Sequence, residues 1–238
     1  MVLAEVDSTM EEAQRRGPGL SGPEWVIALN QTAARGRRGR PWVHPKGNFA
    51  ATVLLPGHDM ASMPLRSFAM ALALYDALSA ATGRVEGLAL KWPNDVLLNG
   101  GKVAGILLES LRNGPDIAGL AIGIGVNLAE APGHGTVEEG ATPPVSVLSE
   151  TGAAITPEEF LDLLAPAFAH YESQLTTYGF APIREAWLSR AARLGEPIRA
   201  RLTNGEVTGT FEGIDDAGQL VLNTPTGRQS LPAADVFF

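Results

Sequence analysis

The fold is decided by the stretch from Leu88 to Leu128, which reads LALKWPNDVLLNGGKVAGILLESLRNGPDIAGLAIGIGVNL. Apolar residues dominate four runs within it, and such runs between turn residues are typical of strands. Asn99-Gly100 and Asn113-Gly114 are turn signals of the kind that joins two strands in a hairpin. The stretch therefore predicts paired strands in one sheet, at Leu88 to Lys91, Asp95 to Leu98, Lys102 to Leu111 and Ile117 to Leu128.

Helices and two more strands are expected on either side of this stretch. Ser8 or Thr9 could cap a helix that ends near Arg16, with Glu11 or Glu12 completing a capping box. The main helix is expected after Pro64, because a proline at its first turn and Gly83 beyond its end mark both boundaries. Together these segments predict a mixed α/β body with strands at Trp25 to Asn30 and Phe49 to Leu55, and helices at Pro64 to Thr82, from Thr156, and at Ala181 to Arg193.

The residue pattern of the chain changes after Gly195, where short strand-like runs alternate with turn residues. Several short strands at regular spacing, separated by turn residues, are typical of a small barrel. We therefore expect an α+β protein with a mixed-sheet domain at 1–194 and a small β-barrel at 195–238. The expected barrel strands are Pro197 to Leu202, Val207 to Ile214, Gln219 to Leu222 and Gln229 to Leu231.

Composition excludes several classes of function. The 238 residues carry a net charge of −8, which disfavours general nucleic-acid binding because such proteins need a broad basic face. Without cysteine the chain can have no disulfide, thiolate catalysis or Cys-ligated metal. The four histidines show no metal-ligand spacing; they are His44, His58, His134 and His170. With no apolar run long enough for a bilayer and no leader, we expect no membrane contact and a cytoplasmic location.

Against this acidic background, four arginines crowd into six positions between Gln31 and Trp42. Arginine offers planar, bidentate donors that suit phosphate and carboxylate groups. Two glycines among the arginines allow the backbone to approach a ligand closely. A solvated loop or a nucleic-acid patch would look similar, but we interpret the segment as a small-molecule anion site. Its charged members are Arg35, Arg37, Arg38 and Arg40.

Polar residues also interrupt the predicted strands. Lys91 and Lys102 flank a hairpin with Asn94 and Asp95, and a lysine on a central strand is costly to bury unless it meets an anion. Taken singly, these residues are also explained as solvated edge lysines and turn formers. Gly123-x-Gly125-x-Asn127 lacks the third glycine of a dinucleotide fingerprint. We expect instead that these glycines let the strand pack against a flat ligand.

These elements, in this order, resemble the biotin protein ligases. The resemblance rests on Ser8-Thr9, Gln31, the arginine segment with Trp42, Lys-Trp-Pro-Asn-Asp at 91–95, Lys102-Val-Ala-Gly-Ile-Leu-x-Glu and Gly-x-Gly-x-Asn127, and it runs from about residue 5 to the C-terminus. It implies a catalytic domain related to class II aminoacyl-tRNA synthetases and a C-terminal SH3-like barrel. Ala34 and Met10 depart from the family pattern, where Gly and Asn are usual. The chain begins almost at Ser8, so the winged-helix domain of ligase-repressors is expected to be absent.

The resemblance also implies a reaction and a role for each residue. Biotin would attack the α-phosphate of ATP to give biotinyl-5′-AMP and pyrophosphate, and an acceptor lysine would then displace AMP. Lys102, Arg37 and Arg40 would be catalytic, and the same three residues would bind ATP. Asn94 and Asn127 would also bind ATP, by contacting its adenine. Mg²⁺ would accompany ATP, with no metal-ligating residue identified. The residues implied to hold biotin are Ser8, Thr9, Met10, Gln31, Arg35, Gly36, Arg37, Trp42 and Lys102.

The implied partner is a biotin carboxyl carrier protein or domain, with no DNA and no membrane, and the sequence leaves a homodimer open. Two alternatives are retained. A lipoate or octanoate ligase or transferase shares the fold, although the arginine segment and Lys-Trp-Pro-Asn-Asp favour biotin. A non-enzymatic nucleic-acid-binding regulator built on the arginines is disfavoured by the acidic chain and the lack of a helix-turn-helix.

Overall fold

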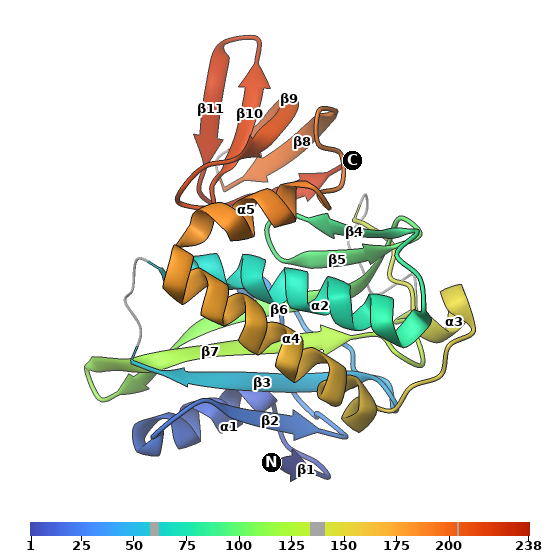
Figure 1. Cartoon of the computed structure of the whole chain (residues 1–238), viewed down its shortest axis with the longest axis vertical. Helices are drawn as coiled ribbons and strands as arrows, with labels where there is room; N and C mark the ends of the chain where they lie inside the picture. The colour runs from blue at the N-terminus through green and yellow to red at the C-terminus, as the bar shows by residue number, and fades with distance from the viewer. Residues whose placement is uncertain (58–61, 134–140, 204) are drawn as a thin grey trace.

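A computed structural model of the protein describes residues 1–57, 62–133, 141–203 and 205–238. Seven strands form one sheet in the order β1-β2-β3-β7-β6-β5-β4, in which β1 is parallel to β2 and all other pairs are antiparallel. The mixed sheet is thus as predicted (Figure 1). Its strands are β1 (Val2–Leu3), β2 (Glu24–Ala28), β3 (Phe49–Pro56), β4 (Leu88–Lys91), β5 (Asp95–Leu98), β6 (Gly101–Asn113) and β7 (Asp116–Val126).

The pair of hairpins predicted from the sequence lies in one half of this sheet, from its central strand β7 to β5. Asn99 and Gly100 both have positive φ, 50° and 82°, as a two-residue type I′ turn between β5 and β6 requires. Gly114, with φ 61°, turns the chain from β6 into β7. β4 to β7 are therefore consecutive neighbours, and residues near the ends of different strands meet at one edge of the sheet.

The helices agree with expectation in part. Thr156 and Glu159 form the capping box of α4, and Ser8 caps α1. The capping box expected for α1 is wrong: Glu11 and Glu12 bind arginines, and Ser8 Oγ accepts from the amide of Met10. α5 ends earlier than predicted, and α3 was not predicted. The helices are α1 (Thr9–Arg16), α2 (Arg66–Thr82, preceded by the 3₁₀ turn Met63–Leu65), α3 (Val147–Thr151), α4 (Pro157–Tyr178) and α5 (Phe180–Leu188).

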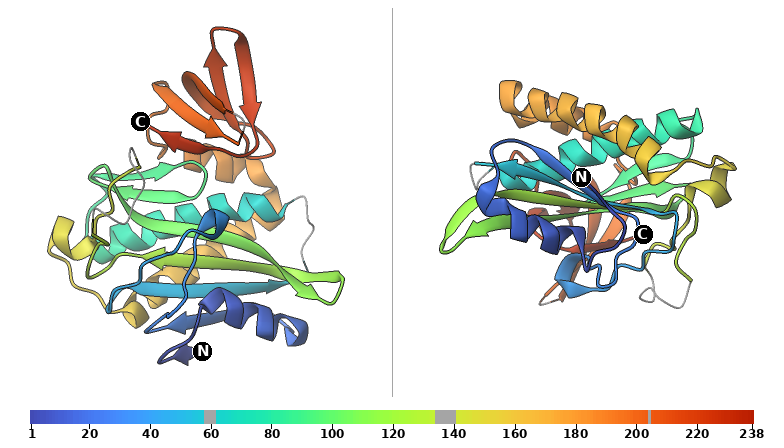
Figure 2. Two further views of the ribbon diagram at one scale, coloured as in Figure 1. Left: turned by 180° about the vertical axis from the view of Figure 1, so that it is seen from behind. Right: turned by 90° about the horizontal axis from the view of Figure 1, so that it is seen from below.

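Alternation along the strands gives the sheet two apolar faces. On β3, Val53 and Leu55 belong to the large core under α2 and α4, whereas Leu54 belongs to a smaller cluster with Met10 and Ala13 of α1. Figure 2 shows α2 and α4 on one side of the sheet and α1 on the other. The face that carries α1 is only partly covered by helix, which leaves room for a site there.

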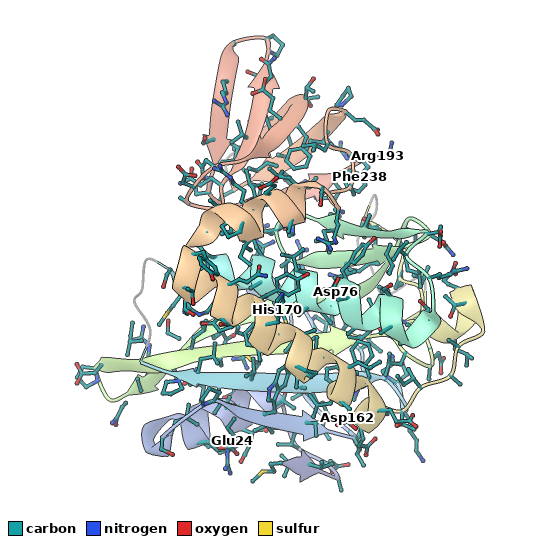
Figure 3. All side chains as sticks on the ribbon, viewed as in Figure 1. Glu24, Asp76, Asp162, His170, Arg193 and Phe238 are labelled. Carbon is teal, nitrogen blue, oxygen red and sulfur yellow. The ribbon has the colours of Figure 1, made fainter. Side chains whose placement is uncertain are left out.

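A second sheet follows, antiparallel throughout, in the order β11-β10-β9-β8-β12. Its last strand was not predicted, and this strand brings the chain end back toward the first sheet. Figure 3 shows Phe238 beside Arg193 at the junction of the two sheets, with the guanidinium 5.5 Å from the ring centroid. The strands are β8 (Pro197–Leu202), β9 (Gly205–Ile214), β10 (Leu220–Thr224), β11 (Gly227–Leu231) and β12 (Asp235–Phe237).

Two expectations from composition can be compared with the structure. Among the described residues, no helix combines the length and apolar character needed to cross a membrane. His44 Nε2 donates to the carbonyl oxygen of Asn48 at 2.9 Å, and burial lowers the pKa of this imidazole. His170 bonds Gln174 on α4, so these two histidines have packing or surface roles, while His58 and His134 lie outside the described residues.

Candidate active site

A cavity of about 440 Å³ lies on the sheet face that carries α1. Its floor is made by β6 and β7, and its walls are α1, the arginine segment, the segment at 141–144 and the terminal strand β12. All the residues implied to bind biotin or ATP line this cavity: Ser8, Thr9, Met10, Gln31, Arg35, Gly36, Arg37, Arg40, Trp42, Asn94, Lys102 and Asn127.

One end of the cavity is a small polar network. The amide and Oγ1 of Thr9 both donate to Gln31 Oε1, at 2.8 and 3.2 Å, and Thr52 Oγ1 donates to Thr9 Oγ1 at 2.9 Å. Ser8, Thr9 and Thr52 are almost fully buried. The start of α1 and the loop after β2 are therefore locked together, and their hydroxyl and amide groups form a rigid set of donors and acceptors.

The glycines of β7 have a different role from the one predicted. A Cβ on Gly125 would lie 2.5 Å from the ring of Trp42, and a Cβ on Gly123 would lie 2.8 Å from Met10 Sδ. A Cβ on Gly105, which pairs with Gly125, would also meet Trp42, at 3.2 Å. The flat group packed over these strands is thus an indole of the protein itself. The expectation that the two glycines face a flat ligand is wrong for this reason.

Arg35 lines the cavity, and its side chain is anchored by two carboxylates outside the cavity lining. Its guanidinium donates to Glu11 of α1, and to Glu109 of β6 at 2.8 Å. These bonds tie the beginning of the arginine segment to α1 and to β6. A guanidinium that is already paired twice is better suited to shape the segment than to bind a ligand, so Arg35 can serve a ligand mainly through its backbone.

The other three arginines gather around one carboxylate of the second sheet. Asp235 of β12 lies 2.7 Å from Arg38 Nη1, 3.1 Å from Arg40 Nη2 and 3.8 Å from Arg37 Nη1. Arg37 also donates to Asn94 Oδ1 at 3.4 Å. Burial lowers the pKa of Arg37, an effect that the nearby carboxylates oppose. Cations outnumber this carboxylate three to one, and an excess of positive charge faces the cavity.

The chain has three lysines, and two of them are in the cavity. Lys102 Nζ lies 2.6 Å from Asp95 Oδ1 and 5.5 Å from the centroid of the Trp42 ring. Lys91, only 7% exposed, donates to Thr142 Oγ1 at 2.6 Å. Burial lowers the pKa of Lys91 below its ordinary value. Both ammonium groups are held near the arginines by the β4–β5–β6 hairpins.

The two asparagines occupy different places. Asn94 Nδ2 donates to the carbonyl of Ile106, which puts this side chain on the arginine side. Asn127 follows β7, and its Nδ2 donates to the carbonyl of Val145 at 3.0 Å. Its Oδ1 is buried and has no hydrogen-bond partner among the described residues. A buried acceptor at the cavity wall lacks only a donor, which a ligand can supply.

Some members of the site could not be found from the sequence. Asp235 stands on a three-residue strand without a turn signal, in a chain rich in acidic residues. Glu11 resembles an ordinary surface glutamate, and Thr52 lies inside an apolar strand. Two other members carried a signal: Asp95 belongs to the Lys-Trp-Pro-Asn-Asp segment, and Glu109 ends the Lys102-Val-Ala-Gly-Ile-Leu-x-Glu motif.

Comparison with known proteins gives matches over most of the chain. Residues 2–127 match the biotin/lipoate A/B protein ligase family, and residues 194–238 match the biotin protein ligase C-terminal domain. A biotin–[acetyl-CoA-carboxylase] ligase of Paracoccus denitrificans is 64% identical, over 100% of this chain and 99% of that protein. The bifunctional ligase/repressor BirA of Bacillus subtilis is 32% identical, over 99% of this chain and 73% of that protein.

A solved structure is similar in fold as well. Biotin protein ligase from Aquifex aeolicus, in complex with biotin and ATP, superposes with a TM-score of 0.83 at 26% identity. The match covers 99% of this chain and 96% of that chain. Both sheets are therefore included in the likeness.

Proposed function

This chain belongs to the biotin protein ligase family, and we propose that the cavity described above is where it activates biotin with ATP and passes the biotinyl group to a lysine of an acceptor protein. A carboxylate oxygen of biotin forms a bond to the α-phosphorus, and the bond to pyrophosphate breaks. The acceptor's neutral amine then attacks the acyl carbon, an amide bond forms, AMP leaves, and the amine loses a proton. Neither step needs an enzyme nucleophile. What both steps need is charge neutralisation and positioning.

The polar network at the α1 end is the proposed site for the ureido ring. Ser8, Thr9 and Gln31 present hydroxyl and amide groups whose positions are set by bonds within the protein. A urea group both donates and accepts hydrogen bonds, and these hydroxyl and amide groups can accept from it and donate to it. Met10 fills the space above Gly123 and closes the apolar side of this end.

Lys102 and the arginine segment are the proposed site of phosphoryl chemistry. Lys102 would bridge the biotin carboxylate and the α-phosphate, and Arg37 would neutralise the same pair. Arg40 would face the leaving pyrophosphate, and the backbone of Arg35 and Gly36 would contact the carboxylate. Fixed donors in a water-poor cavity stabilise charge that develops in the transition state more strongly than water does.

The orphan acceptor of Asn127 supports an adenine site at the end of β7. Its Oδ1 can accept from the exocyclic amine of adenine, while Nδ2 stays bound to Val145. Asn94 was also predicted at adenine, but its bonds to Ile106 and Arg37 favour a role in orienting Arg37. Trp42, packed on Gly125, is proposed to cover the bound ligand.

Mg²⁺ is proposed only as a companion of ATP. The described residues contain no group of three or more carboxylates or histidines that could hold a metal. Asp95 and Asp235, which are the two carboxylates among the described residues that line the cavity, already face cations. Magnesium commonly keeps several waters and binds through substrate phosphates. The residues present fit that arrangement, in which Mg²⁺ screens the charge of ATP and the protein adds few ligands.

The acceptor is proposed to be a biotin carboxyl carrier domain of acetyl-CoA carboxylase, in keeping with the name of the Paracoccus relative. The division into a catalytic unit at 1–194 and a barrel at 195–238 is also a proposal, supported by the second sheet beginning at Pro197. A cytoplasmic location is proposed because the reaction uses ATP. A homodimer stays a prediction.

Transfer of labelled acyl groups tests the proposed function against the lipoate alternative. The purified protein is given ATP, the carrier domain and either biotin, lipoate or octanoate. Of the three acids, we expect only biotin to label the carrier lysine. The polar groups of the ring site can bond a urea, whereas a dithiolane or an alkyl chain would leave these groups without hydrogen-bond partners. Equal labelling with lipoate or octanoate would instead assign this protein to the lipoate or octanoate ligases and transferases. Labelling that a carrier Lys→Arg variant abolishes confirms the acceptor atom.

A further inference from the structure

A carboxylate of the second sheet, with no assigned role in the reaction, makes ion pairs with the arginine segment at the cavity. Asp235 is the first residue of β12, its side chain is 15% exposed, and it is about two hundred positions from the arginines it meets. Three consecutive cations of one short segment, Arg37, Arg38 and Arg40, lie within 4 Å of this single carboxylate.

The backbone of the arginine segment is strained where Asp235 binds most closely. Arg38 has φ 57° and ψ 26°, a left-handed conformation that residues other than glycine adopt at a cost. Such a conformation persists only where the surroundings hold it in place. The shortest contact of Asp235 with the segment, 2.7 Å, is to this residue. The carboxylate therefore holds both the side chains and the turn that carries them.

We propose that Asp235 is a positioning residue for ATP: the C-terminal sheet uses its carboxylate to hold the segment of Arg37, Arg38 and Arg40, so that Arg37 and Arg40, which line the cavity, receive the triphosphate. This inference rests on the proposed function of the cavity. A guanidinium has five N–H donors, so an arginine that gives one or two to Asp235 keeps others for phosphate oxygens. One negative charge among three positive ones reduces their mutual repulsion and still leaves an excess that attracts an anion.

The proposal separates the two ends of the cavity. Among the described residues, Asp235 makes no hydrogen bond or ion pair with Ser8, Thr9 or Gln31, whose own bonds lie within the first sheet, its loops and α1. Removal of the carboxylate should therefore affect the use of ATP and leave the use of biotin unchanged. A contact that only stabilises the junction of the sheets would affect both equally or neither.

The test varies ATP and biotin separately in assays of pyrophosphate release. Asp235→Asn is expected to raise KM for ATP on the order of tenfold, because a neutral amide is a weaker acceptor and cannot hold three cations. KM for biotin should stay within about twofold. Asp235→Glu, which keeps the charge, should recover part of the loss. Trypsin should cut Asp235→Asn faster after Arg37 and Arg38 than it cuts the parent.

Asp216 supplies the matched control. It also lies in the C-terminal part and pairs with a residue of the other part, Arg184 on α5, but its side chain is 93% exposed and outside the cavity. Asp216→Asn should change neither KM. Arg38→Ala tests the same contact from the exposed side of the segment without touching the second sheet, and should raise KM for ATP as Asp235→Asn does.

An unchanged KM for ATP in both Asp235→Asn and Arg38→Ala would overturn the proposal. A lower KM for ATP in Asp235→Asn would also overturn it, because the carboxylate would then compete with phosphate. The parent must release pyrophosphate in response to biotin for the comparison to be made. Failure of the proposed function would thus appear in the parent, and failure of this inference only in the variants.

Discussion

Lys102 Nζ lies 2.6 Å from Asp95 Oδ1, across the hairpin that joins β5 to β6. The register pairs Lys102 with Leu97, which is two residues along β5 from Asp95, so the hairpin itself sets the position of the ammonium group. The ion pair and the Trp42 ring hold the lysine at the cavity wall instead of in solvent. A cation held in this way is preorganised for charge that appears during a reaction.

Replacement of Arg37 should make the intermediate escape. If Arg37 neutralises the carboxylate–phosphate pair, Arg37→Ala should release more free biotinyl-AMP per turnover than the parent. Arg37→Lys should restore only part of the retention, because an ammonium cannot reproduce the bidentate fork of arginine. Chromatography of the reaction without acceptor measures the released adenylate. Release equal to the parent's in Arg37→Ala would remove the assignment.

Gly125→Ala should disturb the cavity through Trp42. The new Cβ would lie 2.5 Å from the indole, so the ring must move, at a cost of about 1–3 kcal/mol typical of overpacking. The urea concentration at the midpoint of unfolding should fall, and biotinyl-AMP should dissociate from the protein faster. Gly22→Ala, which meets nothing within 4 Å, is the control and should leave both unchanged. The double variant Gly125→Ala/Trp42→Ala should regain stability; if it does not, the ring is not the obstacle.

Tyr171 predicts a pH dependence of stability remote from the site. Its hydroxyl donates to Asp76 Oδ2 at 2.7 Å between α4 and α2, and burial, followed by this bond, raises the pKa of Tyr171 to about 12. The unfolded phenol titrates near pH 10, so the stabilisation is complete below about pH 10 and is lost as the pH rises through about 12.

Tyr171→Phe should cost about 1 kcal/mol at neutral pH and should remove this part of the alkaline loss. Urea midpoints from neutral pH to about pH 12 measure both effects. Tyr178→Phe is the control, because Tyr178 is 73% exposed. An equal alkaline loss in Tyr171→Phe and the parent would contradict the assignment.

Local signals predicted much of the fold. The Asn-Gly turns, the cap at Thr156 and the alternating apolar runs act within a few residues, and the structure confirms the elements that they predicted. The misses depend on distant contacts. Glu11 joins Arg35 instead of capping its own helix, and the glycines of β7 make room for side chains that are remote in sequence.

The same limit applies to the site. The predicted ligand residues all line one cavity, because the family motifs carry them. Nothing near Asp235 indicates that it meets arginines at the other end of the chain, and β12, at three residues, is too short for a periodic pattern. Charge pairing between the second sheet and a distant loop is decided by tertiary packing, which a single sequence does not reveal.

The central claim is that Lys102 and the arginine segment activate biotin with ATP. Its most direct test is the rate of pyrophosphate release in a single turnover, for the parent, Lys102→Gln and the exposed control Lys46→Gln. We expect biotin-dependent release by the parent and by Lys46→Gln. Lys102→Gln should be slower by about a hundredfold, or roughly 3 kcal/mol, with a smaller effect on biotin affinity and the fold intact. Near-normal release by Lys102→Gln would contradict the account.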